Sequence, residues 1–391
     1  MPSDLAYWMI AVPIQSNDPH QMMSSLSKIL LKDNLTTSNE LGPLSLPPFK
    51  TGTLDQLINL SEELPRSDNQ FTQIVAKVVD TLRNLLNNDA EALGQHIQVN
   101  EQSIDDYLLS WSWNGQRYRT DRSIREIVDT LTKEITSIDN VMKNKLNSYN
   151  TAKGQLQQIQ RRRNGNLSTR ALGDVVHRND IVDPNSEYIE TLIVAVPNNN
   201  VKDWQSRYER LTDMVVPRSS NKLASDEEYS LFNVTVFKKV KEEFCNKCRE
   251  NKFVIRDFRW EDDLAEQQKA ELDEANVSEK ELWTELLRLA RTNFSEAYMV
   301  LTHIKVIRTF VESVLRFGLP AEYFGIVVKP NPKRTKALLS SLTSHFSYLE
   351  APGKKGKGNS SGNDDAPGEY AAYLEQEQYP FVLTEQFLVA A

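Results

Sequence analysis

The feature that most constrains this chain is a pair of helical patterns, each too long to be buried inside one small domain. From Ser123 to about Arg163, apolar residues recur at steps of three and four, the spacing of a heptad seam, with one interruption at Lys145: Ile124, Val128, Leu131, Ile135, Ile138, Met142, Tyr149, Ala152, Leu156 and Ile159. At roughly 1.5 Å per residue, this helix extends for on the order of 60 Å. It needs a partner along most of its length.

The second pattern begins after Trp260 with three acidic residues, and it contains no proline or glycine before it ends at Phe317. We expect a break near Asn276, because Ser278-Glu-Lys-Glu281 has the form of a capping box. The simplest arrangement runs one helix out and the other back, so we predict an antiparallel pair.

The charges of the two patterns favour this pairing. Residues 141–163 contain six basic residues and no acidic one, whereas residues 261–285 contain ten acidic residues and two lysines. In an antiparallel pair, the basic end of the first helix lies beside the acidic start of the second. The alternative is two separately solvated charged faces, in which exposed ion pairs contribute little.

Six short β-branched or aromatic runs predict strands: 7–13, 191–197, 229–237, 252–260, 324–330 and 379–387. Capping-box sequences predict helix starts at Thr53, Ser67 and Ser123. The resulting fold is α+β and helix-rich, an elongated dumbbell with two α/β globular domains. We place one domain at 164–258 and assemble the other from 1–118 and 319–391, joined by long helices at 119–163 and 259–318.

Composition narrows the classes of function. No apolar run approaches the roughly 20 residues of a membrane span, and Asp4 near the start argues against a signal peptide. Two cysteines in 391 residues fit a reducing compartment, so we expect a cytoplasmic protein. The net charge of −8 argues against nucleic acid as a partner.

A search for chemistry finds no convincing site. Cys245-Asn-Lys-Cys248 lies inside a predicted helix, whereas a redox pair begins at a helix N-terminus and a zinc site needs two further ligands. The run Gly353–Ser360 resembles a phosphate loop but lacks the lysine before the serine and the flanking strand and helix. The histidines are isolated, at positions 20, 96, 177, 303 and 345. We therefore predict no catalytic, cofactor-binding or metal-binding residue.

The end of the second helix is dense in both charge and apolar surface. A helical wheel places His303 within the apolar half, so we expect a core histidine, and it places a charged stripe on the opposite, exposed face: Lys305, Arg308, Glu312 and Arg316. Gly318 is expected to form a left-handed cap, with Leu319 packing back and Pro320 ending the helix.

Several blocks resemble one family. The segment HIKVIRTFVESVLRFGLP (303–320) closely resembles the signature of the C subunit of the vacuolar-type proton-pumping ATPase (V-ATPase). Further blocks agree in order over almost the whole chain: PPFKTGTLDQLINLSEEL (47–64), GNLSTRALGDVV (165–176), ETLIVAVP (190–197), YSLFNVTVFKK (229–239) and ENKFVIRDF (250–258). Residues 14–46 and 352–368 depart from the resemblance or are poorly anchored in it.

The resemblance implies a non-catalytic stator component with a head (164–258), a neck of two long helices and a foot (1–118 and 319–391). It implies binding to two peripheral stalks, each a heterodimer of the E and G subunits, and to the cytosolic N-terminal domain of the pump's a subunit. It also implies control of reversible pump assembly, with the H subunit and actin as further family contacts and no homo-oligomer. The chain would then lie on the cytosolic face of endomembranes, or free in the cytosol after release.

We expect the stalk contacts to involve residues 167–180 of the head and 49–64 of the foot. Two alternatives stay open at this point. One is a free-standing cytoskeletal tether that binds actin, and the other is a thiol oxidoreductase acting through Cys245 and Cys248.

Overall fold

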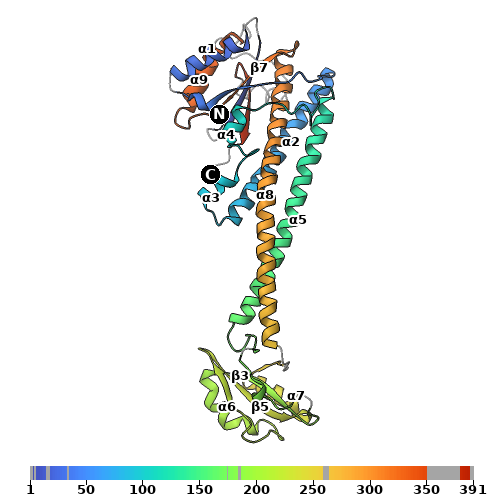
Figure 1. Ribbon diagram of the computed structural model, residues 1–391, viewed down its shortest axis with the longest axis vertical. Coiled ribbons are helices and arrows are strands. Elements are labelled where there is room, and N and C mark those ends of the chain that lie inside the picture. Colours follow the sequence, from blue (N-terminus) through green and yellow to red (C-terminus); the bar gives the residue numbers. More distant parts are fainter. Residues whose placement is uncertain are drawn as a thin grey trace, which may run out of the picture. The chain divides into compact units, whose positions relative to one another are not determined.

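The computed structural model describes residues 3, 6–14, 18–32, 35–173, 175–183, 186–258, 264–349 and 379–387. The chain divides into two compact units, of which the first combines Met1–Asn144 with Glu285–Ala391 and the second is Lys145–Thr284. Each unit contains helices and one four-stranded sheet (Figure 1). The predicted mixed class of helix and sheet is therefore confirmed.

The sheet of the first unit has the strand order β2-β7-β1-β8, with every neighbouring pair antiparallel. Its strands are β1 (Ala6–Pro13), β2 (Leu41–Leu44), β7 (Tyr323–Val328) and β8 (Val382–Phe387). Three of them were predicted from the sequence, whereas the four-residue β2 was not. Every residue of β7 is buried, as are seven of the eight in β1, which shows that both faces of the sheet are covered.

Helices cover both faces of this sheet. On one face, α1 (Pro19–Lys32) and α9 (Thr335–His345) pack side by side, and their leucines share a core with Trp8, Ile10 and Ile326 (Figure 1). The opposite face of β8 meets α8 (Leu264–Phe317) through hydroxyl and amide side chains. The sheet is thus a central layer, and α8 is one of its outer layers.

In the described part of the first unit, the remaining α-helices are α2 (Leu54–Leu85), α3 (Ala90–His96) and α4 (Ile104–Leu109), together with the first half of α5 (Ile124–Asn164). The capping box at Thr53 is present, and α5 begins directly after Ser123, as predicted. The predicted start at Ser67 is wrong, because α2 continues through Pro65. The buried stripe of α2 extends on both sides of that proline, and its burial outweighs the roughly 3 kcal/mol cost of an internal proline.

The second unit has a sheet with the strand order β4-β5-β3-β6, again antiparallel. Its strands are β3 (Ile189–Pro197), β4 (Lys222–Ser225), β5 (Tyr229–Phe237) and β6 (Val254–Arg256). Helices α6 (Val201–Arg207) and α7 (Lys241–Glu250) pack on one face, around Trp204 and Phe244. Of the predicted strands, β5 matches its range, β6 is shorter than expected, and β4 was not predicted.

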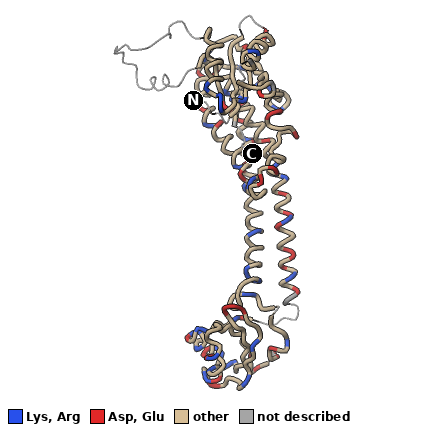
Figure 2. The backbone as a smooth tube through the Cα atoms, turned by 90° about the vertical axis from the view of Figure 1, so that its left-hand side faces the viewer, with Lys and Arg blue, Asp and Glu red and all other residues tan. Residues whose placement is uncertain are grey.

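The two long helices are continuous. The predicted seam of α5 is buried or half-buried at every position, and α8 runs for 54 residues without the break expected near Asn276. Within the second unit the two helices are antiparallel, since Tyr149 bonds to Glu279 while Arg162 and Arg163 share a cavity wall with Glu266. Acidic residues follow one another along α8 there (Figure 2).

The division into units falls inside α5 and α8, so the domain boundaries drawn from the sequence stay predictions. Among the residues described, no helix is both long enough and apolar enough to span a membrane.

Candidate functional site

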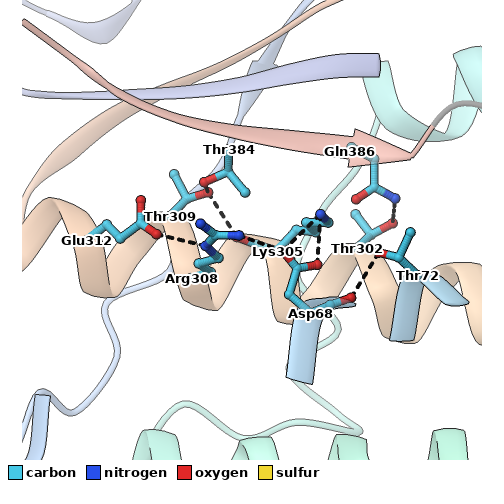
Figure 3. A network of polar contacts seen from close by, with 9 residues as sticks. All are labelled: Asp68, Thr72, Thr302, Lys305, Arg308, Thr309, Glu312, Thr384 and Gln386. Atoms are coloured by element: carbon cyan, nitrogen blue, oxygen red, sulfur yellow. Dashed lines mark hydrogen bonds and ion pairs between the residues drawn. The ribbon is translucent and has the colours of Figure 1, made fainter. Parts of the chain in front are cut away.

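Four charged side chains meet where α2 packs against α8 in the first unit (Figure 3). Asp68 of α2 and Lys305 of α8 are 3% and 7% exposed. The Nζ atom of Lys305 lies 2.8 Å from Oδ1 and 2.9 Å from Oδ2 of Asp68, and Nη1 of Arg308 lies 2.8 Å from the same Oδ2. Arg308 also donates to Glu312 over 2.7 Å. One carboxylate of α2 therefore binds two cations of α8.

This arrangement corrects the prediction that Lys305, Arg308 and Glu312 lie on an exposed stripe. Arg308 pairs with Glu312 one turn along the stripe, but Lys305 is buried and Arg308 is largely covered. The wheel was drawn for α8 alone, and α2 packs on the face that the wheel left for solvent. Asp68 supplies the countercharge that makes this burial tolerable.

Burial lowers the pKa of Lys305, and Asp68 opposes that shift by stabilising the charged ammonium. Removing one partner of such a pair leaves an uncompensated buried charge, which typically costs about 3–5 kcal/mol. The cluster therefore fixes α2 against α8 in one register, because any sliding of the helices separates these charges.

Hydroxyl and amide side chains continue this polar contact from α8 to the sheet. Thr309 donates to Thr384 of β8 over 2.9 Å, and Gln386 of β8 donates to Thr302 over 3.5 Å. All four side chains are buried. The helix α8 is thus held on one side by ion pairs to α2 and on another by directional hydrogen bonds to β8.

The segment 111–118 lies between α5 and α8 and joins them near Glu134 and Glu296. Arg117 forms ion pairs with Glu134 of α5 (3.1 Å) and Glu296 of α8 (2.7 Å). Tyr118 donates to Glu134 as well, and its ring lies 4.8 Å from that of His303. This segment bridges two helices whose residues are more than 150 positions apart in the sequence.

His303 is a core residue, as predicted. Its Nδ1 lies 2.7 Å from the carbonyl oxygen of Met299, so Nδ1 carries the proton, and Nε2 accepts from the backbone N–H of Asn114. Burial lowers the pKa of His303 to about 4. The neutral ring is fully hydrogen-bonded, which leaves it no free position for a metal or a substrate.

The end of α8 is anchored by backbone acceptors from the segment before β8. Arg316 donates to the carbonyls of Phe381 and Tyr379. Gly318 has φ +82°, the left-handed cap that was predicted. The prediction that Leu319 packs back is wrong, because its side chain is 70% exposed. Tyr323 packs there instead: its hydroxyl donates to the Gly318 carbonyl and its ring lies beside that of Phe317.

The cysteine pair lies within α7, one turn apart, and both thiols are free. Burial raises the pKa of Cys245 and raises the pKa of Cys248 to about 12, so both are protonated at neutral pH. A redox pair needs a lowered thiol pKa. The raised thiol pKa values therefore argue against a reactive thiolate at this pair.

The other sequence candidates do not come together in a site. His20, His96 and His345 belong to the first unit and His177 to the second. Among the described residues, no group of three or more potential ligands could hold a metal ion. The Gly353–Ser360 run lies outside the described residues.

The two predicted contact segments differ in surface character. In the segment 49–64, Leu54 and Ile58 lie one turn apart at the start of α2 and are 63% and 42% exposed. In the segment 167–180, Leu167 and Leu172 are buried; between them, Thr169 is exposed and Ser168 and Arg170 are half-buried.

Sequence reasoning missed Asp68, although a signal was present. The apolar stripe of α2 continues at helical spacing from Leu64 to Phe71, and Asp68 falls between them at a position expected to be apolar. A lone carboxylate in an apolar stripe indicates a buried partner, here 237 positions away at Lys305.

Comparison with known proteins gives a consistent result. A model of the family described as the C subunit of the V-ATPase matches residues 7–382. The chain is 35% identical over 376 residues to the V-type proton ATPase C subunit (1-A) of Danio rerio, and 34% identical over 378 residues to the V-type proton ATPase C subunit (1) of Xenopus laevis and of Bos taurus. Each alignment covers 96% of both chains. A solved cytoplasmic N-terminal domain of the I subunit, a homologue of the V-ATPase a subunit, aligns over 87% of this chain and 97% of its own with 12% identity. Its TM-score of 0.34 is too low to carry an argument.

Proposed function

The chain belongs to the family of V-ATPase C subunits, and from that premise we propose that it is a non-catalytic stator component of the proton pump. In this role it bridges two E–G peripheral stalks and the cytosolic N-terminal domain of the a subunit. It thereby couples the ATP-hydrolysing sector to the proton-translocating sector on the cytosolic face of the membrane. Its release into the cytosol would uncouple the two sectors, which gives control of assembly.

The observation that carries the proposal is the family match over 7–382, and the continuous helices support it mechanically. Both α5 and α8 contribute residues to both compact units. A link built from helices resists extension without relying on a flexible connection. The dumbbell with head, neck and foot is part of this proposal.

The fixation of α8 within the first unit suits a part that transmits force. Ion pairs from Asp68 and hydrogen bonds from β8 hold the helix against displacement along its axis. Apolar contacts alone would resist such sliding less, because they have little directional preference.

Residues 49–64 and 167–180 are the stalk contacts in this proposal. In the first segment, Leu54 and Ile58 form a small exposed apolar patch on the otherwise polar surface at the start of α2. An interface that must be released is expected to be modest in area and largely polar, with a few such apolar anchors.

The test is co-purification of the full chain with recombinant E–G heterodimers. The double variant Leu54→Asp/Ile58→Asp should weaken capture at least tenfold, whereas Val277→Asp, an exposed apolar residue of α8 outside both segments, should not. Failure of the unaltered chain to capture the heterodimers, together with direct binding to actin filaments, would instead support the free-standing tether. Imaging of the intact pump would show whether the chain spans two stalks.

A further inference from the structure

The first unit contains a cavity of about 1160 Å³, lined by the end of α1, the turn before α9 and α9 itself, that the proposed stator role does not use. Lys333, Arg334 and Lys336 line it, and its described lining contains no carboxylate. That composition is unusual in a chain with a net charge of −8. The helices α1 and α9 contain no aspartate or glutamate either, so neither helix beside the cavity offers Lys333 or Lys336 a countercharge.

Two of the cations in the cavity form no ion pair with any other described residue of the chain. They are Lys333 and Lys336, and both are exposed. Asn331 fixes the backbone of the turn, since its Oδ1 accepts from the Lys333 N–H (3.1 Å) and its carbonyl from the Arg334 N–H (2.8 Å). The positive charge is therefore held on an ordered turn.

Hydroxyl groups line the same cavity along α9. Ser340, Ser341 and Ser344 face it within one helical turn, and none of their hydroxyls donates to a described partner. Cations combined with free hydroxyl donors suit phosphate oxygens, which accept several charge-assisted hydrogen bonds at once. A carboxylate partner would use fewer of these donors.

The size of the cavity and the residues that line it restrict the class of ligand further. Its volume exceeds what one phosphate ion needs and lies slightly above the roughly 300–1,000 Å³ of typical small-molecule sites. The apolar part of the wall comes from Ile29, Leu35, Pro332 and Ala337. The only aromatic ring in the described lining is the imidazole of His345, which packs against the ring of Phe346 and offers a nucleobase less stacking surface than a phenyl or indole ring would. These features favour a compact polyol that carries several phosphates over a nucleotide.

We propose that this cavity binds a multiply phosphorylated polyol headgroup, with Lys333 and Lys336 as the anion-binding cations. The same chemistry is available from a soluble inositol phosphate and from a phosphoinositide headgroup at a membrane surface. The proposal is independent of the stator role, because it concerns the isolated chain and a cavity inside one unit.

The experiment measures binding of the full chain at 150 mM salt to four probes: inositol 1,4,5-trisphosphate, vesicles that contain phosphatidylinositol 4,5-bisphosphate, ATP and inorganic phosphate. We expect the trisphosphate or the phosphoinositide vesicles to bind at least tenfold more tightly than ATP or phosphate. Binding of the free trisphosphate assigns a soluble ligand, and binding of the vesicles alone assigns a lipid headgroup. Tighter binding of ATP, or no preference among the four probes, overturns the proposal.

Two double variants distinguish specific binding in this cavity from non-specific electrostatic attraction. Lys333→Gln/Lys336→Gln should weaken binding at least tenfold, whereas the matched pair Lys202→Gln/Lys239→Gln removes two exposed lysines of the second unit and should leave it unchanged. All four lysines are exposed, so both variants should fold, which circular dichroism checks. Equal losses in the two variants would show non-specific attraction and refute the site.

Discussion

We expect acidification to destabilise the first unit through His303, because this ring is buried in its neutral form. Its folded pKa is lowered from 6.5 to about 4 by burial among aromatic rings. Between these two pH values the unfolded chain binds a proton that the folded chain does not. Stability from this group is therefore complete above about pH 6.5, falls as the pH falls toward 4, and changes no further below that.

The size of the effect follows from the two pKa values. A full separation of 2.5 units corresponds to about 3.4 kcal/mol, of which about 2 kcal/mol is lost between pH 7 and pH 5. Carboxylates also begin to titrate in this range, so the wild-type change alone does not isolate the histidine. The variant His303→Gln keeps a donor and an acceptor but cannot be protonated, so its loss over the same interval should be smaller by about 2 kcal/mol.

The assay is urea unfolding at pH 7 and pH 5, followed by tryptophan fluorescence, for both proteins. Nitrogen NMR of labelled histidine gives a direct check without any mutation. It should show His303 neutral at pH 5 with the proton on Nδ1, as its bond to the Met299 carbonyl requires. A protonation midpoint above pH 6, or a proton on Nε2, would refute the reasoning.

Three further results are expected. Asp68→Asn should lower the free energy of unfolding by about 3 kcal/mol, because it leaves Lys305 buried without its countercharge. In the same urea titration, the control Asp80→Asn, at an exposed ion pair, should change it by less than about 1 kcal/mol. Similar losses in the two variants would contradict the role given to Asp68. Gly154→Ala, in open space inside α5, should stabilise the protein by roughly 0.5–1 kcal/mol, whereas Gly318→Ala should destabilise it by about 1 kcal/mol because φ at Gly318 is +82°. Calorimetry measures the sign of each change in stability. Changes of the same sign in both variants would count against the left-handed cap at Gly318. In the folded protein, Cys248 should resist iodoacetamide at pH 8, since burial raises the pKa of its thiol to about 12, and it should react after unfolding. Mass spectrometry would detect the modification. Rapid alkylation of Cys248 in the folded protein would contradict this expectation.

The sequence predicts the regular parts of this fold well, because their signals are local. The strand 229–237 combines a β-branched run with a defined end, and the seam of α5 repeats over ten positions. The false helix start at Ser67 arose because a proline and a capping sequence carry the same local signal whether or not a buried stripe continues past them. The four-residue strands β2 and β4 are too short to show a period.

The charged cluster was less predictable for a physical reason. A wheel of α8 divides that helix into apolar and polar halves but contains no information about which neighbour covers the polar half. Lys305 is buried because Asp68 reaches it from 237 positions away, and only the tertiary structure shows that pairing. The position of Cys245 and Cys248 inside a helix was predictable from the sequence, because the helical pattern begins before Cys245.

The order of strands in the first sheet has a consequence for how the protein is made. The strand β1 pairs with β7 and β8, so its two partners leave the ribosome more than 300 residues after it. The second unit is one continuous segment, Lys145–Thr284, and its sheet can close while the last hundred residues are still being synthesised. The apolar strand AYWMIAVP must wait unpaired during that interval, when an exposed strand is prone to aggregate. We therefore expect the nascent chain to depend on a chaperone at β1, and a chain halted before β8 to have a folded second unit and an unfinished first one.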